Sequence, residues 1–154
     1  AYEIKECDWS SDVCSSDLSR LPDVGPDPQF HFPRIARHVL GNGLAVRTIE
    51  HHGIPVVTFV LQVEGGSGAD PAGKEGLAAL TADMLDEGTG NLSALDVSDA
   101  LARIGAEYDV DVGSDATVFT LTTLTRFASR GASLLADMVT RPSLQLAEIG
   151  RAHV

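Results

Sequence analysis

The stretch SALDVSDALARIGAEYDVDVGSDATVFTLTTL, residues 93–124, encodes a helix followed by two strands. Ser93 is a favourable N-cap, Asp96 completes a capping-box pattern, and Gly105 stands where a helix would end. Four apolar residues between these signals recur at helical spacing, namely Ala94, Val97, Leu101 and Ile104. The pattern predicts an amphipathic helix from Ser93 to Gly105.

Two strands are expected directly after this helix. Segments 106–112 and 116–124 are separated by Gly-Ser-Asp, and the second segment alternates threonine with valine, phenylalanine and leucine. These residue types favour strands. A last helix is predicted from about Arg126, and Pro142 prevents its continuation.

Upstream, the segment 37–50 reads as a β-hairpin. Its Gly-Asn-Gly at 41–43 contains the Asn-Gly pair that supplies the positive φ angles of a tight turn. The next run, PVVTFVLQVE at 55–64, is almost continuously β-branched or apolar. Such a run predicts a central strand that is buried on both faces.

A glycine-rich connector, GGSGAD at 65–70, follows that run. We expect it to be flexible, and it lacks the Gly-Lys-Ser/Thr ending of a phosphate-binding loop. A helical pattern then covers 74–87, and Gly88 ends it. The expected order is β-β-β-α-α-β-β-α. This order predicts an α+β fold of two layers, with a mixed, mostly antiparallel sheet and helices on one face.

Composition narrows the classes of partner. The chain has 154 residues, with 11 Lys and Arg against 22 Asp and Glu, so its formal net charge is −11. Such an acidic chain is unsuited to nucleic acid. The sequence contains no apolar run long enough to cross a bilayer.

Several strings, taken in order, resemble the N-terminal module of the pitrilysin/insulinase family of zinc peptidases, which includes the mitochondrial processing peptidase. The matching strings are LGNGLAV (40–46), GKEGLAALTADMLDEGT (73–89), IGAEYDVDVGSDATVFTLTTL (104–124) and LLADMVTRP (134–142), with the strand and connector before residue 70. The resemblance implies this family's α+β fold and its peptidase-related functions.

Active members of the family carry H-x-x-E-H on the helix after the connector. Two histidines at i and i+4 share a helix face and bind zinc, and the glutamate acts as general base. The matching positions here are Ala79, Ala82 and Asp83. Two methyl groups cannot bind a metal or take a proton, and one carboxylate is not a catalytic zinc site. We therefore predict no catalytic residue, no cofactor and no metal in this chain.

Three other groups of residues have weaker functional readings. His51 and His52 are adjacent, so their side chains would point to opposite faces of a strand end, which favours a solvated turn over a metal site. Asp83, Asp86 and Glu87 could form a catalytic acid pair or a cation site, but an acidic surface or lining patch near a helix end is favoured. Asp109, Asp111 and Asp115 faintly resemble a calcium-binding loop. The valines between them favour a strand whose carboxylates lie on its solvent-exposed face.

Both ends of the chain resemble translated sequencing-library adapter. DVCSSDL (12–18) and EIGRAHV (148–154) can be encoded by complementary strands of one DNA element, and the likeness extends back through 1–18. We therefore expect 1–18 and 148–154 to be adapter-derived rather than native. This reading removes both cysteines, Cys7 and Cys14, and the only tryptophan.

The expected organisation is a linker or extended arm over 19–36 and a truncated family module over 37–147. Between the two ends the chain keeps 16 acidic and 9 basic residues, a net charge of −7. We expect the natural N-terminus to lie upstream. The sequence is compatible with a periplasmic or a cytoplasmic location in a bacterium.

Inactive modules occur in this family as partners of active ones. We therefore expect a non-catalytic subunit or domain that binds an extended peptide and completes the chamber around a zinc-bearing partner. That partner would be a catalytic subunit or a second module of the same chain. Two alternatives are a structural scaffold without a proteolytic role and an active zinc peptidase.

Overall fold

The computed structural model describes residues 25–27, 29 and 31–145. Both segments assigned above to adapter sequence, 1–18 and 148–154, lie outside these residues. No helix of the described part is long and apolar enough to cross a membrane. The chain divides into two compact units, Ala1–Glu50 and His51–Val154, and each unit is considered by itself.

The first unit contains the expected hairpin. Strand β1 (Ile35–Val39) pairs antiparallel with β2 (Ala45–Ile49), and it begins two residues before the predicted start at residue 37. The turn differs in detail, because Gly43 alone has a positive φ, 87°. Asn42 instead accepts a hydrogen bond from the Leu44 amide through Oδ1 at 3.1 Å.

The second unit contains a three-stranded sheet, a short two-stranded sheet and three α-helices in the described residues. The elements are β3 (Val56–Glu64), α1 (Leu77–Asp83), β4 (Gly88–Thr89), β5 (Leu92–Ser93), α2 (Ala94–Arg103), β6 (Glu107–Val112), β7 (Ala116–Leu124) and α3 (Ala128–Thr140), with short 3₁₀ turns η2 (Ser67–Ala69) and η3 (Thr125–Phe127). The strand order in the larger sheet is β3-β7-β6, and both pairings are antiparallel.

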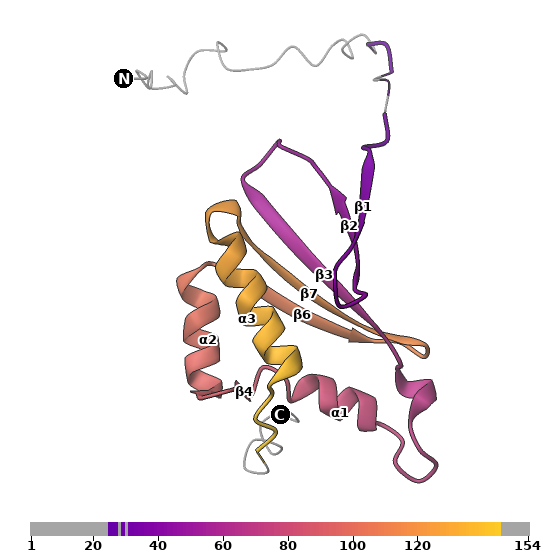
Figure 1. Cartoon of the computed structure of the whole chain (residues 1–154), viewed down its shortest axis with the longest axis vertical. Coiled ribbons are helices and arrows are strands. Elements are labelled where there is room, and N and C mark those ends of the chain that lie inside the picture. The colour runs from indigo at the N-terminus through magenta and orange to yellow at the C-terminus, as the bar shows by residue number, and fades with distance from the viewer. Residues whose placement is uncertain (1–24, 28, 30, 146–154) are drawn as a thin grey trace, which may run out of the picture. The chain divides into compact units, whose positions relative to one another are not determined.

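All three helices pack on one face of this sheet (Figure 1). The central strand β7 shows why, because its buried side chains occur at every second position: Thr117, Phe119, Leu121 and Thr123. Phe119 and Leu121 pack in one core cluster with Ala82 of α1 and Leu135 of α3. Val97 of α2 joins a second cluster with two residues of α3. The α+β fold with helices on one face is confirmed.

The interpretation of residues 55–64 as a central strand buried on both faces is wrong for the described residues. Strand β3 is at an edge of its sheet, and none of its residues is fully buried. Val57, Phe59 and Leu61 are half-buried, while the residues between them are exposed. The half-buried residues of this run therefore lie on one face of β3, and Val60 lies on the opposite, exposed face.

The helix α1 is shorter than the predicted 74–87. Gly73 and Gly76 adopt positive φ angles of 80° and 92°, so the helix cannot begin before Leu77. It ends at Asp83, and the next four residues form a bend that leads into β4.

By contrast, the capping box of α2 is present as expected: the Ser93 side chain accepts a hydrogen bond from the Asp96 amide, and the Asp96 carboxylate accepts one from the Ser93 amide.

The connector 65–70 is held in place, which contradicts its prediction as flexible. Its backbone amides at Gly65, Ser67 and Gly68 donate to carbonyls of the β6–β7 turn, 113–115, at 2.9 Å each. Gly66 is buried, and a Cβ there would approach the Gly113 carbonyl oxygen to 2.1 Å. Glycine is therefore required for close contact between two backbones rather than for mobility.

Candidate functional site

Helix α1 carries the three positions where the resembled family has its zinc motif. Its start is fixed by Asp70, whose two carboxylate oxygens accept hydrogen bonds from the Gly76 amide at 2.7 Å and the Ala78 amide at 2.9 Å. The side chain therefore satisfies two amides that the helix leaves unpaired at its N-terminus. Because Asp70 ends the held connector, the connector also positions α1.

A second carboxylate stabilises the loop before the helix. Glu75 accepts a hydrogen bond from the Gly73 amide at 2.9 Å, and this bond is the main reason that the pKa of Glu75 lies below its usual value. The loop between connector and helix is thus fixed by two acidic side chains.

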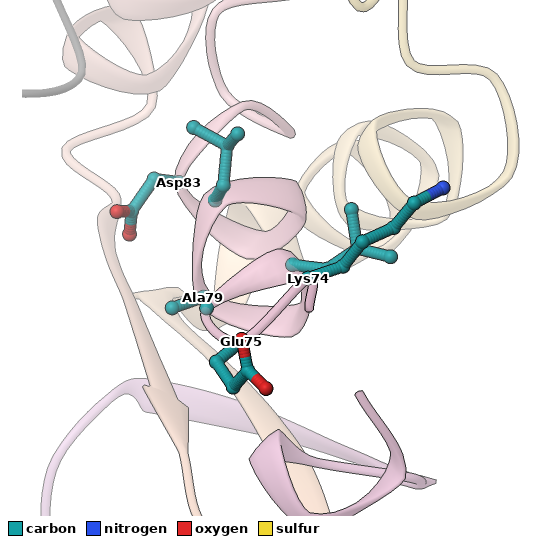
Figure 2. Close-up of a pocket in the computed structure, with 7 residues that line it drawn as sticks. Lys74, Glu75, Ala79 and Asp83 are labelled. Atoms are coloured by element: carbon teal, nitrogen blue, oxygen red, sulfur yellow. The ribbon is translucent and has the colours of Figure 1, made fainter. Parts of the chain in front are cut away.

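The three motif positions differ in their surroundings. Ala79 is half-buried, Ala82 is 2% exposed within the core, and Asp83 is exposed. Figure 2 shows Ala79 and Asp83 on the same side of α1, with the Lys74 ammonium directed away from both. They line an open concavity of about 450 Å³, the α1 concavity, together with Lys74, Glu75, Gly76, Leu77 and Leu80.

These residues do not fit a zinc ion. Asp83 is the only one of the three with a lone pair that could bind a metal, and a catalytic zinc has three protein ligands. In the part of the chain that the structure describes, no group of three or more His, Cys, Asp or Glu is placed to hold a metal. Helix α1 can therefore contribute only its surface shape, apolar contacts and the one negative charge of Asp83 to binding.

The other candidate residues are partly brought together. His51 and His52 lie exposed between β2 and β3, and the His51 ring folds over Gly53. Asp109 and Asp111 are on the exposed face of β6, as expected for a wet strand face, while Asp115 is in the following turn.

Asp83, Asp86 and Glu87 line a second concavity, and the sequence indicated this acidic patch but not the β6 residues that complete its lining. The remaining lining residues are Tyr108, Asp109 and Val110 of β6, and the volume is about 290 Å³. We refer to it as the acidic concavity. It joins the end of α1 to β6, and its four carboxylates come from two segments that are separated by about twenty residues.

Burial raises the pKa of two groups there. It raises the pKa of Asp86, and the nearby Asp83 charge acts in the same direction, against a hydrogen bond from the backbone of Asp86 itself. Burial is also the main cause that raises the pKa of Tyr108, followed by the charges of Asp86, Asp109 and Asp83. The Tyr108 hydroxyl is buried and has no hydrogen-bond partner in the described structure.

The outer edge of β6 is also open. Strand β6 pairs only with β7 among the described strands. The Gly113 amide donates to the Ala116 carbonyl at 2.9 Å, so the odd-numbered residues of this pairing form the hydrogen-bonded pairs with β7. The backbone groups of Tyr108, Val110 and Val112 therefore point away from β7. An unpaired edge of this kind can accept another strand.

Comparison with known proteins agrees with this fold. The chain is 27% identical over 135 residues to the mitochondrial-processing peptidase subunit beta of Mus musculus and to that of Rattus norvegicus. These alignments cover 88% of this chain but 27% of each relative, so the chain spans about a quarter of their length.

Solved structures of similar fold include the inactive domain of a peptidase M16 from Pseudomonas fluorescens, with a TM-score of 0.70 and 24% identity over 77% of this chain and 29% of that one. A protease from Helicobacter pylori gives 0.71 and 21% over 79% of this chain and 29% of that one, and pitrilysin gives 0.70 and 22% over 78% and 13%. The model of the insulinase family, peptidase family M16, matches residues 45–154. This chain therefore belongs to the insulinase family of peptidases, family M16.

Proposed function

We propose that this chain is a non-catalytic module of an M16 peptidase, which holds an extended peptide beside a zinc-bearing partner. The observation that carries the proposal is the content of α1, where Ala79, Ala82 and Asp83 occupy the three positions of the family's zinc motif. None of them can act as the general base of the family reaction except Asp83, which is exposed and has no neighbouring ligand set.

The burial of Ala82 supports the proposal that the module is non-catalytic. In the core it contacts the cluster that contains Leu85, Phe119 and Leu121, so a carboxylate at this position would displace apolar packing. The helix is therefore adapted to packing at the position where the family reaction needs a base. Its remaining function is to form one wall of a surface concavity.

Peptide binding is supported by the open edge of β6 next to that wall. Three residues of β6 present unpaired backbone groups outward, and the acidic concavity lies between this strand and the end of α1. An extended peptide could pair with this edge and place side chains in the concavity. Edge pairing supplies main-chain hydrogen bonds, which hold peptides of many sequences.

A partner is expected on chemical grounds. One of the relatives is by name a subunit of a larger enzyme, and another is by name an inactive domain. A module without a base or a metal can contribute to peptide cleavage only if another module supplies both. We propose that this other module is a separate catalytic subunit or a second module of the same polypeptide.

The proposal is tested by incubating the chain with a labelled extended peptide and measuring both binding and cleavage. Fluorescence anisotropy should give saturable binding, and mass spectrometry should recover the peptide intact, with or without added zinc. Cleavage that a chelator abolishes would contradict the proposal in favour of an active peptidase. Absence of saturable binding to any extended peptide would contradict it in favour of a scaffold.

A further inference from the structure

The turn of the β1–β2 hairpin contains a reactive pair of residues that the proposed function does not use. Asn42 is followed by Gly43, and both residues are exposed. The carboxamide of an asparagine can be attacked by the backbone nitrogen of the next residue, because the product is a five-membered imide ring. A side chain on that next residue crowds the approach, so its identity decides how readily the ring closes.

Gly43 leaves this approach open. Glycine has no Cβ, and a Cβ built at Gly43 would have no heavy atom within 4 Å apart from those of its chain neighbours. The Gly43 amide donates to the Leu40 carbonyl at 2.9 Å, so ring closure requires this one hydrogen bond to open. A single backbone hydrogen bond in an exposed turn belongs to the least stable part of a structure and opens often.

The Asn42 carboxamide is positioned for the same reaction. Its Oδ1 accepts a hydrogen bond from the Leu44 amide at 3.1 Å, and a bond to the residue two positions on folds the side chain back along the backbone past Gly43. Negative charge develops on Oδ1 when the Gly43 nitrogen adds to Cγ. The Leu44 amide is placed to stabilise that charge, as backbone N–H groups do in an oxyanion hole.

We propose that Asn42 is a site of spontaneous deamidation. The Gly43 nitrogen loses its proton to hydroxide and forms a bond to Cγ of Asn42, and the carboxamide nitrogen takes up a proton and leaves as ammonia. Water then opens the imide at either of its two carbonyls. The products are aspartate and isoaspartate at position 42, so one water is consumed, one ammonia is released and no oxidant or reductant is needed.

Both products change the hairpin. Residues 35–49 include Arg37, His38 and Arg47 and no acidic residue, so either product introduces the first carboxylate of this segment. Isoaspartate also adds a methylene group to the main chain of the turn that joins β1 to β2. A two-stranded hairpin is only marginally stable by itself, so a lengthened turn should weaken its pairing.

Asn91 is a matched internal control for the reaction. It is the only other asparagine of the chain, and it is also exposed in a turn, between β4 and β5. Its successor is Leu92, which has a side chain and belongs to β5.

The test incubates the full chain in mildly alkaline buffer and follows both asparagines by peptide mapping with mass spectrometry. We expect half of Asn42 to be converted while Asn91 is still almost entirely intact. Conversion of Asn42 that is no faster than that of Asn91, including no conversion of either, would overturn the proposal.

The products and the pH dependence test the imide route. An imide opens at both carbonyls, so isoaspartate should accumulate together with aspartate, whereas direct hydrolysis of the carboxamide gives aspartate alone. Conversion should also become faster as the pH rises above neutrality, because the attacking nitrogen must lose its proton. Aspartate without isoaspartate, or a rate that does not depend on pH, would overturn the proposal.

Variants assign the reaction to the turn. Asn42→Gln keeps a carboxamide but would have to close a six-membered ring, so we expect residue 42 to stay unmodified. Asn91→Gln makes the same change in the other turn and should leave the conversion of Asn42 unchanged. The unfolding midpoint of each variant checks that the fold is retained. Undiminished conversion at residue 42 in Asn42→Gln would overturn the proposal.

Discussion

Ala82 connects the chemistry of α1 to the packing of the sheet. It is 2% exposed and contacts the core beneath the helix, whereas Asp83, its neighbour in the chain, is exposed to the α1 concavity. The two residues illustrate how the motif positions divide between the core and the surface. The same division determines what substitutions at each position should do.

Replacing Ala82 by glutamate should destabilise the fold strongly. The change places a larger and ionisable side chain in a packed apolar cluster, and we expect a loss of about 2–4 kcal/mol in the free energy of unfolding. Urea denaturation measures this loss. Ala136→Glu makes the same change at an exposed position of α3 and should alter stability by less than about 0.5 kcal/mol. Equal stability of the two variants would show that Ala82 is not a core residue.

Asp86 should make stability depend on pH. Burial raises the pKa of its carboxyl in the folded protein, so the folded state holds the proton more tightly than the unfolded state. The sign of the linkage is that stability falls as pH rises from the usual pKa of 3.8 through the raised value, where ionisation of the half-buried carboxyl is completed.

Asp86→Asn should therefore raise Tm at pH 7 by a few degrees, and the gain should vanish as the pH falls towards the usual pKa of an aspartate. Differential scanning calorimetry across this range measures the effect. Asp99→Asn, which removes an exposed charge, serves as the control for net charge. A gain that did not change with pH would argue against burial of Asp86 as the cause.

At the scale of elements, local signals predicted boundaries well where the sequence itself makes the stabilising contacts. The helix α2 begins after Ser93 because Ser93 and Asp96 cap it, and both residues are local in the sequence. Strands β6 and β7 are also close to their predicted bounds, since the intervening Gly-Ser-Asp forms a turn. These elements could be predicted because their determinants are neighbours in the chain.

Sequence patterns did not fully predict α1, β3 or the connector 65–70. The extent of α1 depends on positive φ angles at Gly73 and Gly76 and on the Asp70 carboxylate. The exposure of β3 depends on which faces of its sheet are covered, which an apolar run cannot reveal. The sequence of the connector 65–70 predicts flexibility because it does not reveal the partners of its hydrogen bonds. These partners lie in the β6–β7 turn, far away in the sequence.

Substituting Asp70 should loosen the start of α1 in particular. Asp70→Ala removes the acceptors of the Gly76 and Ala78 amides, and we expect a loss of about 1–2 kcal/mol. Hydrogen exchange should accelerate at these two amides before others in the chain. Asp115→Ala, in the exposed β6–β7 turn, is a matched control that should leave both amides protected. Unchanged protection in Asp70→Ala would show that another group fixes the helix.

At the scale of the whole molecule, the sequence predicted the family, but not that the acidic residues at the end of α1 share a concavity with β6. Ala79, Ala82 and Asp83 are adjacent in one motif and can be read directly. The acidic concavity combines Asp86 and Tyr108, which the fold brings together from separate elements. Its location, and the open edge of β6 beside it, therefore depend on tertiary structure.

The chain spans about a quarter of the length of its curated relatives, with 27% coverage of each. We propose that this module contributes a surface, rather than catalytic groups, to the assembled protein. The proposal predicts that this module binds no stoichiometric zinc. This can be measured on the chain as it is, without a partner or a substrate.

The most direct measurement is the zinc content of the untagged chain after equilibrium dialysis against micromolar zinc, determined by mass spectrometry of the metal. The account predicts no stoichiometric zinc in the unchanged chain. The variant A79H/D83H, which places two imidazoles at i and i+4 on α1, should gain zinc and so serves as the positive control. About one zinc per unchanged chain, lost in Asp83→Asn, would contradict the account.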